Sequence, residues 1–351
     1  MEYNRLGRTD LKVSAVGLGV MTFGAQTAED DAFRQLDIAS EAGINFFDTA
    51  ENYPAPVSAN THGRSEEILG RWISARGLRD HIVIATKVAG PGNASGNLDH
   101  IRGPERRLDR ANIQAAVESS LRRLSTDYID LYQVHWPERP ITTQGRTRFS
   151  HLPEAPSLVP IEETFAALSE QVAAGKVRHI GIANESPWGV MRYLAAADAQ
   201  GLQRIVSIQN GYSLLDRQFE LGLAEIAMRE HVGLIAYSPL VGGLLTGKYS
   251  QSAAPIEGTR SAIMAGFAQA RFTPKKLAAT AAYAQLARRN GLDLADMALA
   301  FVRQRPFTTS VLMAASRSSQ LQSNLRSVDV TLAKDLIKAI DAIHDDQPNP
   351  R

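Results

Sequence analysis

Four polar side chains lie at or just after the ends of three largely apolar runs, where they could carry out acid–base chemistry. The four are Asp48, Tyr53, Lys87 and His135. The runs before them span residues 44–47, 82–86 and 128–134. Strand interiors favour Ile, Val and Phe and disfavour Asp, so we interpret each run as a buried strand. If these strands are parallel neighbours, the four groups meet at one mouth.

An acid, a phenol, an amine and an imidazole fit together chemically. The phenol of Tyr53 has an ordinary pKa of about 10, and the ammonium of Lys87 would lower that pKa by stabilising the phenolate. Asp48 would keep the amine charged and in place, and a neutral His135 could orient a carbonyl oxygen. The set suits protonation of a carbonyl oxygen while another group attacks its carbon. Taken alone, Asp48 and Lys87 could equally form a structural ion pair.

The sequence resembles the aldo-keto reductases and is most similar to their bacterial Tas-like members. The superfamily motifs are residues 17–24 (GLGVMTFG), 47–53 (FDTAENY), 86–88 (TKV), 130–137 (DLYQVHWP) and 236–240 (AYSPL). The Tas-like segments are residues 209–215 (QNGYSLL) and 296–303 (DMALAFVR). The similarity runs in order from about Tyr3 to Ile343.

The resemblance implies an enzyme that reduces aldehydes or ketones with NADPH. Tyr53 would be the general acid, Lys87 and Asp48 would tune it, and His135 would orient the substrate. Because these side chains cannot supply a hydride, a nicotinamide cofactor must do so. Trp136 would line the substrate pocket, and the aromatic residues near the mouth suggest an apolar or aromatic carbonyl compound.

By the same resemblance, the cofactor lies across the mouth on residues from the second half of the chain. Tyr237 would stack on the nicotinamide ring, while Asn184 and Gln209 would bind its carboxamide. The residues nearer the pyrophosphate would be Ser238, Pro239, Leu240, Gly242, Lys248 and Arg260. The adenosine end would rest on Ala314, Ser316, Arg317, Gln320 and Asn324, and Met21 completes the set.

The adenosine end decides between the two nicotinamide cofactors. Arg317 could make a bidentate contact with a 2′-phosphate, which favours NADPH over NADH. Ser316 or Ser318 could cap a helix N-terminus, where anions bind well. The chain departs from the common residues of the family at three cofactor positions, which are Ala183, Ala314 and Ser323. These departures affect binding rather than chemistry.

Strand-like runs alternate with helix-like segments along the whole chain. The runs begin near Ala15, Ile44, Ile82, Ile129, Arg178, Ile205, Gly233 and Ser310, after a short hairpin over residues 3–13. Eight such units predict a single (β/α)8 TIM barrel over residues 1–351, with helical crossovers between parallel strands. An open doubly wound sheet is the alternative, but the Gly-x-Gly-x-x-Gly motif typical of it is missing after the first strand. Asp109, Ser186 and Thr273 are the expected helix N-caps.

Three long segments follow strands at the proposed active face. They span residues 53–64, 137–160 and 241–272. Long loops in compact domains are commonly functional, so we predict that these three form the walls of the substrate pocket. Surface insertion without function is the alternative.

Composition excludes several classes of function. The 351 residues carry a net charge of +1, so there is no basic excess to hold nucleic acid or an anionic membrane. The sequence has no cysteine, no apolar signal segment at its start and no run long enough to span a membrane. We therefore expect a cytoplasmic enzyme, with or without oligomerisation. The histidines and acids show no metal-ligand spacing.

Two other functions stay open at this point. Some members of the superfamily serve mainly as NADP(H)-sensing subunits of membrane channels, and an intact catalytic set does not exclude such a regulatory module. A metal-dependent barrel enzyme is the third possibility, and the lack of clustered ligands argues against it.

Overall fold

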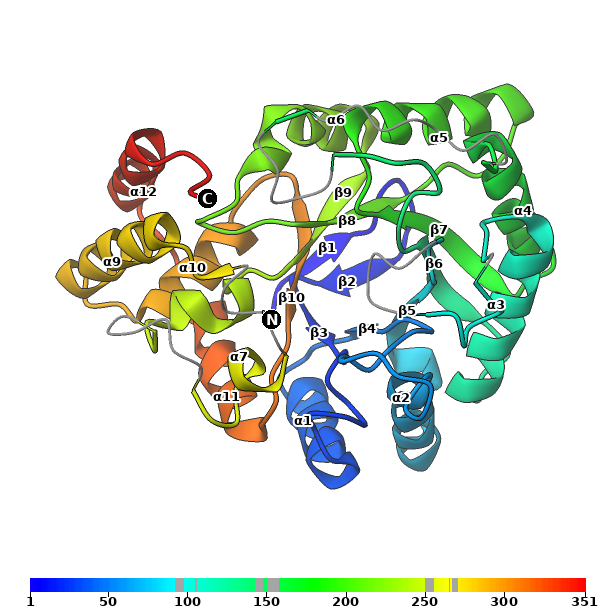
Figure 1. Ribbon diagram of the computed structural model, residues 1–351, viewed down its shortest axis with the longest axis horizontal. Coiled ribbons are helices and arrows are strands. Elements are labelled where there is room, and N and C mark those ends of the chain that lie inside the picture. The colour runs from blue at the N-terminus through cyan, green and yellow to red at the C-terminus, as the bar shows by residue number, and fades with distance from the viewer. Residues whose placement is uncertain are drawn as a thin grey trace.

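The computed structural model describes residues 1–91, 98–104, 106–142, 148–149, 158–249, 256–264, 266 and 271–351. At its centre, parallel strands close into a barrel in the order β10-β3-β4-β5-β6-β7-β8-β9 (Figure 1). The strands are β3 (Val16–Gly19), β4 (Phe46–Asp48), β5 (Val83–Val88), β6 (Ile129–Val134), β7 (Val177–Ala183), β8 (Ser207–Gly211), β9 (Gly233–Tyr237) and β10 (Thr308–Met313). The predicted barrel is confirmed, and each strand begins within two residues of its expected position.

Closure of the barrel depends on β10, which pairs with β9 on one side and with β3 on the other. An open doubly wound sheet would leave two unpaired edges, so that alternative is excluded. Every residue of β4, β5, β6 and β10 is buried. This is expected for parallel strands covered by helices outside and filled by side chains inside.

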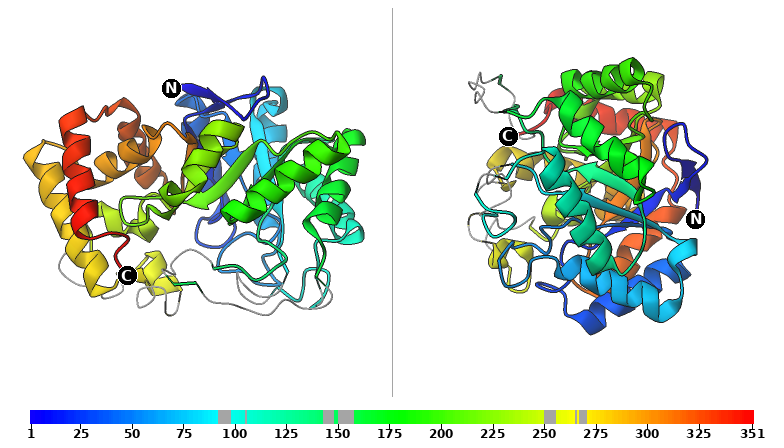
Figure 2. Two further views of the ribbon diagram at one scale, coloured as in Figure 1. Left: turned by 90° about the horizontal axis from the view of Figure 1, so that it is seen from above. Right: turned by 90° about the vertical axis from the view of Figure 1, so that its right-hand side faces the viewer.

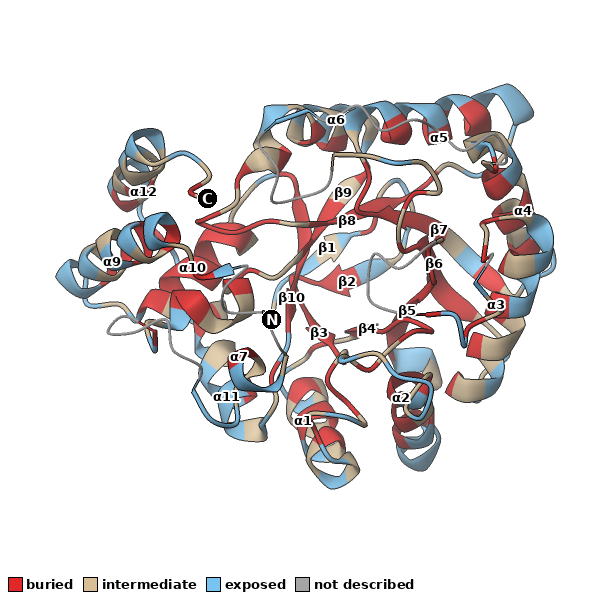
Figure 3. Cartoon of the chain, in the orientation of Figure 1, coloured by how far each residue is buried: buried red, intermediate tan, exposed pale blue. Residues whose placement is uncertain are grey.

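Helices surround the barrel and turn their exposed faces to solvent (Figure 3). The longer ones are α1 (Glu29–Glu41), α2 (Arg64–Arg76), α3 (Arg110–Leu124), α4 (Ile161–Ala173), α5 (Pro187–Gln200), α6 (Leu223–Glu230), α9 (Pro274–Arg289), α10 (Leu294–Arg303), α11 (Ser318–Leu325) and α12 (Lys334–Asp346). Short 3-10 turns are η1 (Arg79–His81), η2 (Gln218–Leu221) and η4 (Arg326–Asp329). The predicted N-caps are confirmed, because Asp109, Ser186 and Thr273 each accept a hydrogen bond from a backbone N–H of the first turn.

An antiparallel hairpin closes the N-terminal end of the barrel. Its strands are β1 (Tyr3–Arg5) and β2 (Lys12–Ser14). Leu6 and Val13 are fully buried and belong to the apolar cluster that fills the barrel interior. Figure 2 shows the hairpin and the short helix α7 (Arg260–Ile263) at opposite ends of the barrel. The hairpin therefore covers the N-terminal end of the barrel, opposite to the end where the strands finish.

The three long segments predicted at the active face follow β4, β6 and β9, at the C-terminal ends of these strands. Residues 143–147 and 150–157 of the second segment lie outside the described residues, as do 250–255, 265 and 267–270 of the third. The third segment contains η3 (Val241–Thr246) and α7 (Arg260–Ile263). The long loop predicted over 241–272 therefore contains short helical turns that the sequence analysis did not expect. Helical turns this short carry no long apolar period for a sequence to reveal.

Candidate active site

The four predicted catalytic residues come together where β4, β5 and β6 end. Lys87 Nζ lies 2.6 Å from Asp48 Oδ2 and 5.2 Å from the centre of the Tyr53 ring. The rings of Tyr53 and His135 meet edge to face, with their centroids 5.7 Å apart. Lys87 is the penultimate residue of β5 rather than the residue after the strand. The structure thus brings a phenol, an ion pair and an imidazole to one mouth.

Both carboxylate oxygens of Asp48 are engaged inside the barrel. Oδ2 accepts from Lys87, which is fully buried and also donates to the carbonyl oxygen of Thr49 over 2.7 Å. Oδ1 accepts from the side-chain amides of Gln209 at 2.8 Å and Gln133 at 3.2 Å. Burial lowers the pKa of Lys87, and the charge of Asp48 opposes that shift. These contacts hold the ammonium at one fixed position below the mouth.

The two amides expected to bind a carboxamide are already bonded to protein groups. Asn184 Nδ2 donates to the carbonyl oxygen of His135 over 2.8 Å, and Asn184 Oδ1 accepts from the Tyr237 hydroxyl over 2.6 Å. The amide nitrogen of Gln209 donates a hydrogen bond to Asp48. A carboxamide could therefore bond the side-chain carbonyl oxygen of Gln209, or it could replace one of the protein groups now bonded to Asn184. The predicted role of both residues stays a prediction.

The pKa of Tyr53 lies above its usual value. Burial is the main cause, and the negative charge of Asp48 and the neighbouring Tyr237 add to it, while Arg260 opposes it. The net lowering of this pKa expected from the sequence is therefore not found, because burial dominates and the charge of Asp48 adds to it. The stabilisation of the phenolate by Lys87 stays a prediction. The phenol therefore keeps its proton at neutral pH, and giving that proton up requires stabilisation of the phenolate that forms.

His135 is a buried, neutral imidazole. Burial and the nearby charge of Lys87 hold its pKa well below the usual value of about 6.5. Its Nδ1 lies 3.1 Å from Oδ1 of Asn52, a residue that the sequence analysis left without a role. The ring of Trp136 stacks beside it at a centroid distance of 6.5 Å. Gly90 packs on Trp136, since a Cβ on Gly90 would stand 2.5 Å from that of Trp136.

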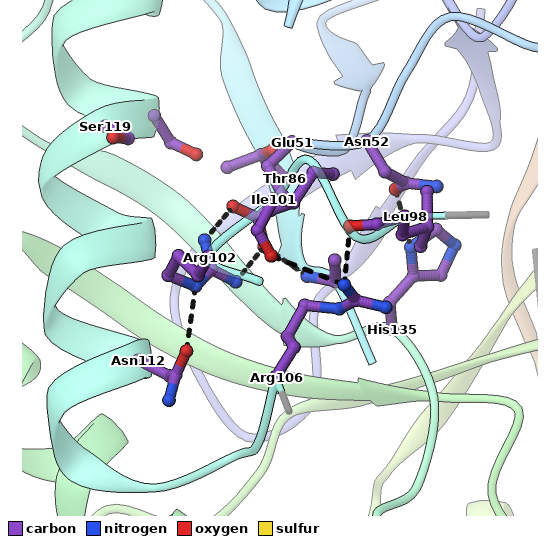
Figure 4. Close-up of polar contacts among 12 residues, drawn as sticks. Glu51, Asn52, Thr86, Leu98, Ile101, Arg102, Arg106, Asn112, Ser119 and His135 are labelled. Atoms are coloured by element: carbon purple, nitrogen blue, oxygen red, sulfur yellow. Dashed lines mark hydrogen bonds and ion pairs between the residues drawn. The ribbon is translucent and has the colours of Figure 1, made fainter. Parts of the chain in front are cut away.

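A layer of buried charged side chains packs next to the residues at the mouth (Figure 4). Glu51 is buried and takes a bidentate contact from Arg102, with N–O distances of 2.6 and 2.7 Å. Arg106, also buried, donates to the carbonyl oxygens of Gly90 and Leu98 over 2.9 and 2.6 Å. Bidentate arginine contacts fix geometry well. The layer therefore ties the segment after β4 to the segment after β5.

His62 lies on the segment after Tyr53 and should make folding sensitive to acid. Burial lowers its pKa to about 4, helped by the charge of Arg123. The unfolded chain binds this proton near pH 6.5, so more protons are bound in the unfolded state between the two values. Stability should fall as pH drops from about 6.5 to about 4. Urea unfolding at pH 7, 5.5 and 4 measures the loss. His62→Gln should lose less than the wild type, and equal losses would contradict the prediction.

The segment after β9 offers backbone for a phosphate chain. Ser238 has a left-handed φ of 54°, and η3 contains Gly242 and Gly243 at φ 67° and 95°. A Cβ on Gly243 would lie 2.8 Å from the ammonium of Lys248. The positive φ favours glycine at both positions. The N–H of Gly243 already donates to the carbonyl oxygen of Leu240 over 2.9 Å.

At the start of α11, side chains of the protein occupy the groups predicted to hold the adenosine end. Gln320 accepts from the backbone N–H and the hydroxyl of Ser316, so its oxygen is used locally. Asp31 of α1 accepts from the backbone N–H of Ser318 at 3.2 Å and from its hydroxyl at 2.7 Å. Arg317 is exposed, and neither predicted serine caps the helix with its side chain.

Comparison with known proteins identifies the family. The sequence model of the Aldo/keto reductase family matches residues 15–345. The chain belongs to the aldo/keto reductase family. Protein tas of Escherichia coli is 48% identical over 345 residues, covering 98% of both chains. Uncharacterized oxidoreductase YrpG of Bacillus subtilis is 35% identical, over 98% of this chain and 96% of its own. A probable voltage-gated potassium channel subunit beta of Arabidopsis thaliana is 31% identical, over 94% and 92%.

Membership of the aldo/keto reductase family makes this chain an oxidoreductase. The family generally uses NAD(P)H and acts on small carbonyl compounds. Within the described residues, no cluster of histidines and acids could hold a metal ion, and no helix is long and apolar enough to cross a membrane.

Sequence reasoning missed three polar residues of the aldo/keto reductase site, although all lie inside the motifs that carried the resemblance. They are Glu51, Asn52 and Gln133. Gln133 stands two residues before His135, and strand side chains alternate between faces. Alternation alone could therefore have placed Gln133 in the barrel interior beside Asp48.

Proposed function

We propose that the chain reduces aldehydes or ketones to alcohols with NADPH, with Tyr53 as the general acid. The observation that carries this proposal is the placement of the Tyr53 ring beside the buried ion pair of Lys87 and Asp48 and edge to face with the imidazole of His135. Tyr53 donates its proton to the carbonyl oxygen as the alcohol forms. The ammonium of Lys87, held in place by Asp48, stabilises the phenolate that is left behind. His135 orients the substrate oxygen.

The residues at the mouth fit a nicotinamide dinucleotide. When bound, this cofactor supplies the hydride. Tyr237 offers an aromatic face next to Tyr53, and the positive-φ glycines of η3 offer backbone for the pyrophosphate. Met21, Pro239, Leu240, Ala314 and Asn324 complete the proposed cofactor set. Arg260, the cationic residue of α7, acts on Tyr53 electrostatically and would contribute to holding the cofactor near the acid.

The proposed preference for NADPH rests on Arg317. Its guanidinium lies against Gly258, where a Cβ would stand 2.8 Å from Nη2, so this arginine borders the segment after β9. Arg317→Ala should weaken NADPH binding about tenfold, the usual value of a charge-assisted contact, and leave NADH binding nearly unchanged. Fluorescence titration with both cofactors measures this. An equal loss for NADPH and NADH would contradict the role.

Asp31 supplies the matched variant for the same titration. Its carboxylate occupies the start of α11, where it would repel a 2′-phosphate. Asp31→Asn keeps hydrogen-bonding atoms in place and removes the charge. It should therefore tighten NADPH binding and leave NADH binding unchanged, the opposite of Arg317→Ala.

We further propose a small apolar or aromatic carbonyl compound as substrate and the cytoplasm as the location. Trp136 is partly exposed beside His135, and Tyr53 and Tyr237 present two more aromatic side chains. Apolar and aromatic walls with few polar groups are typical of small-molecule sites.

The function is tested by following a label from cofactor to product. Purified protein is incubated with NADPH deuterated at C4 and with a panel of aliphatic and aromatic aldehydes. Alcohol carrying deuterium on the former carbonyl carbon supports the proposal. Tight NADPH binding without any labelled alcohol overturns it and favours a cofactor-sensing module. The similarity to a probable voltage-gated potassium channel subunit beta is the observation that supports this second candidate function.

A further inference from the structure

Asn52 is the side chain that contacts the imidazole of His135 on the side of Nδ1. It is 2% exposed and immediately precedes Tyr53. Its Oδ1 lies 3.1 Å from Nδ1 of His135. Among the hydrogen bonds of the described residues, the contact with Nδ1 of His135 is the one that the Asn52 side chain makes. The amide therefore bonds the ring without a second bond that would fix its own orientation.

The proton on an imidazole follows the partner of its other nitrogen. With Oδ1 of Asn52 facing Nδ1, the proton resides on Nδ1, and Nε2 can accept a hydrogen bond. After a half-turn of the amide, its Nδ2–H faces Nδ1 instead, and Nε2 carries a proton that it can donate. A carboxylate at this position could only accept, and it would also attract a second proton to the ring.

We propose that Asn52 is a positioning residue whose amide holds the His135 ring through Nδ1 and, by turning, lets Nε2 carry the proton that it donates to the substrate oxygen. Resting on the proposed function, this lets Nε2 donate to the substrate oxygen in both directions of the reaction, because reduction and oxidation pass through the same transition state and the transferred proton belongs to Tyr53. The imidazole is surrounded by Lys87 of β5, by Tyr53 and by Trp136, which follows His135 in the chain. Asn184, just after β7, donates to the backbone carbonyl oxygen of His135. Among these, Lys87 is the charged group that acts on the ring, and it disfavours a second proton there.

Two substitutions separate charge from contact. Asn52→Asp keeps the acceptor, fixes the proton on Nδ1 and favours the doubly protonated ring. At pH 8 its carbonyl reduction should fall by about ten- to a hundredfold, as for partners that orient metal-bound imidazoles. The rate should recover as pH is lowered, because the charged ring again donates from Nε2. Asn52→Leu has similar bulk and no polar atom, so its kcat should fall at every pH with the pH profile unchanged. Asn290→Asp adds the same charge at an exposed position far along the chain and should match the wild type.

Nitrogen NMR of protein labelled in its histidines gives a readout that does not depend on turnover. His135→Asn assigns the His135 signals. The wild type and Asn52→Leu should show a neutral ring from pH 6 to 8, whereas Asn52→Asp should show a ring that is protonated at higher pH. An Asn52→Asp ring that titrates like the wild type overturns the proposal, whatever happens to kcat. A shifted titration with no carbonyl reduction even by the wild type upholds the role of Asn52 and rejects the proposed function.

Discussion

Tyr53→Phe should lower the rate of carbonyl reduction by about a hundred- to ten-thousandfold while NADPH still binds. The substitution removes one oxygen, and this oxygen carries the proton that the proposed reaction delivers to the substrate. General acid catalysis contributes roughly 10²–10⁴ to a rate, so its complete loss falls in this range. The ring stays, so its contacts with Lys87 and His135 stay as well. Single-turnover rates under saturating NADPH measure the chemical step directly.

The control for this variant is another buried tyrosine. Tyr132→Phe removes a hydroxyl that has no hydrogen-bond partner among the described residues and lies in β6, beneath the mouth. It should keep near wild-type turnover. A Tyr53→Phe protein that reduces aldehydes at the wild-type rate would show that another group protonates the oxygen.

Lys87→Met should cost both activity and stability. The side chain is fully buried, and its loss leaves the charge of Asp48 inside the barrel without its ionic partner. Breaking a buried pair in this way usually destabilises a protein by about 3–5 kcal/mol. Turnover should fall by about two orders of magnitude or more, because nothing then stabilises the phenolate that forms as Tyr53 gives up its proton. Urea unfolding and single-turnover rates measure the two losses separately.

The double variant Lys87→Met with Asp48→Asn separates the two roles of the pair. Removing the orphaned charge should restore much of the lost stability, since Gln133 and Gln209 can still bond the amide oxygen. Turnover should stay low, because the ammonium is still absent. Full recovery of turnover in the double variant would assign Lys87 a structural role only.

Local patterns in the sequence are sufficient for the fold and for the four central residues. Each strand is a short apolar run, and the side chain at its C-terminal end is fixed in place by the strand itself. Because parallel strands in a barrel end at one face, the order Asp48, Lys87, His135 along three consecutive strands already brings these groups together. Tyr53 follows because a short loop keeps it near Asp48.

The partners of these residues depend on tertiary structure. Gln209 reaches Asp48 across 161 residues of chain, and Ser318 reaches Asp31 across 287. No periodicity in the sequence links side chains so far apart. From the sequence alone, many other polar residues would have been equally good candidates for these partners. The helical turns η3 and α7 are likewise too short to be read from an apolar period.

The protonation of the site also depends partly on the sequence and partly on the tertiary structure. The sequence by itself determined that a phenol, an ammonium, a carboxylate and an imidazole share one mouth, because residue type and strand order are local properties. It predicted a lowered pKa for Tyr53 from the charge of Lys87 alone. Only the tertiary structure decided that this pKa is raised, because burial and the compensating charge of Asp48 depend on what packs around the hydroxyl.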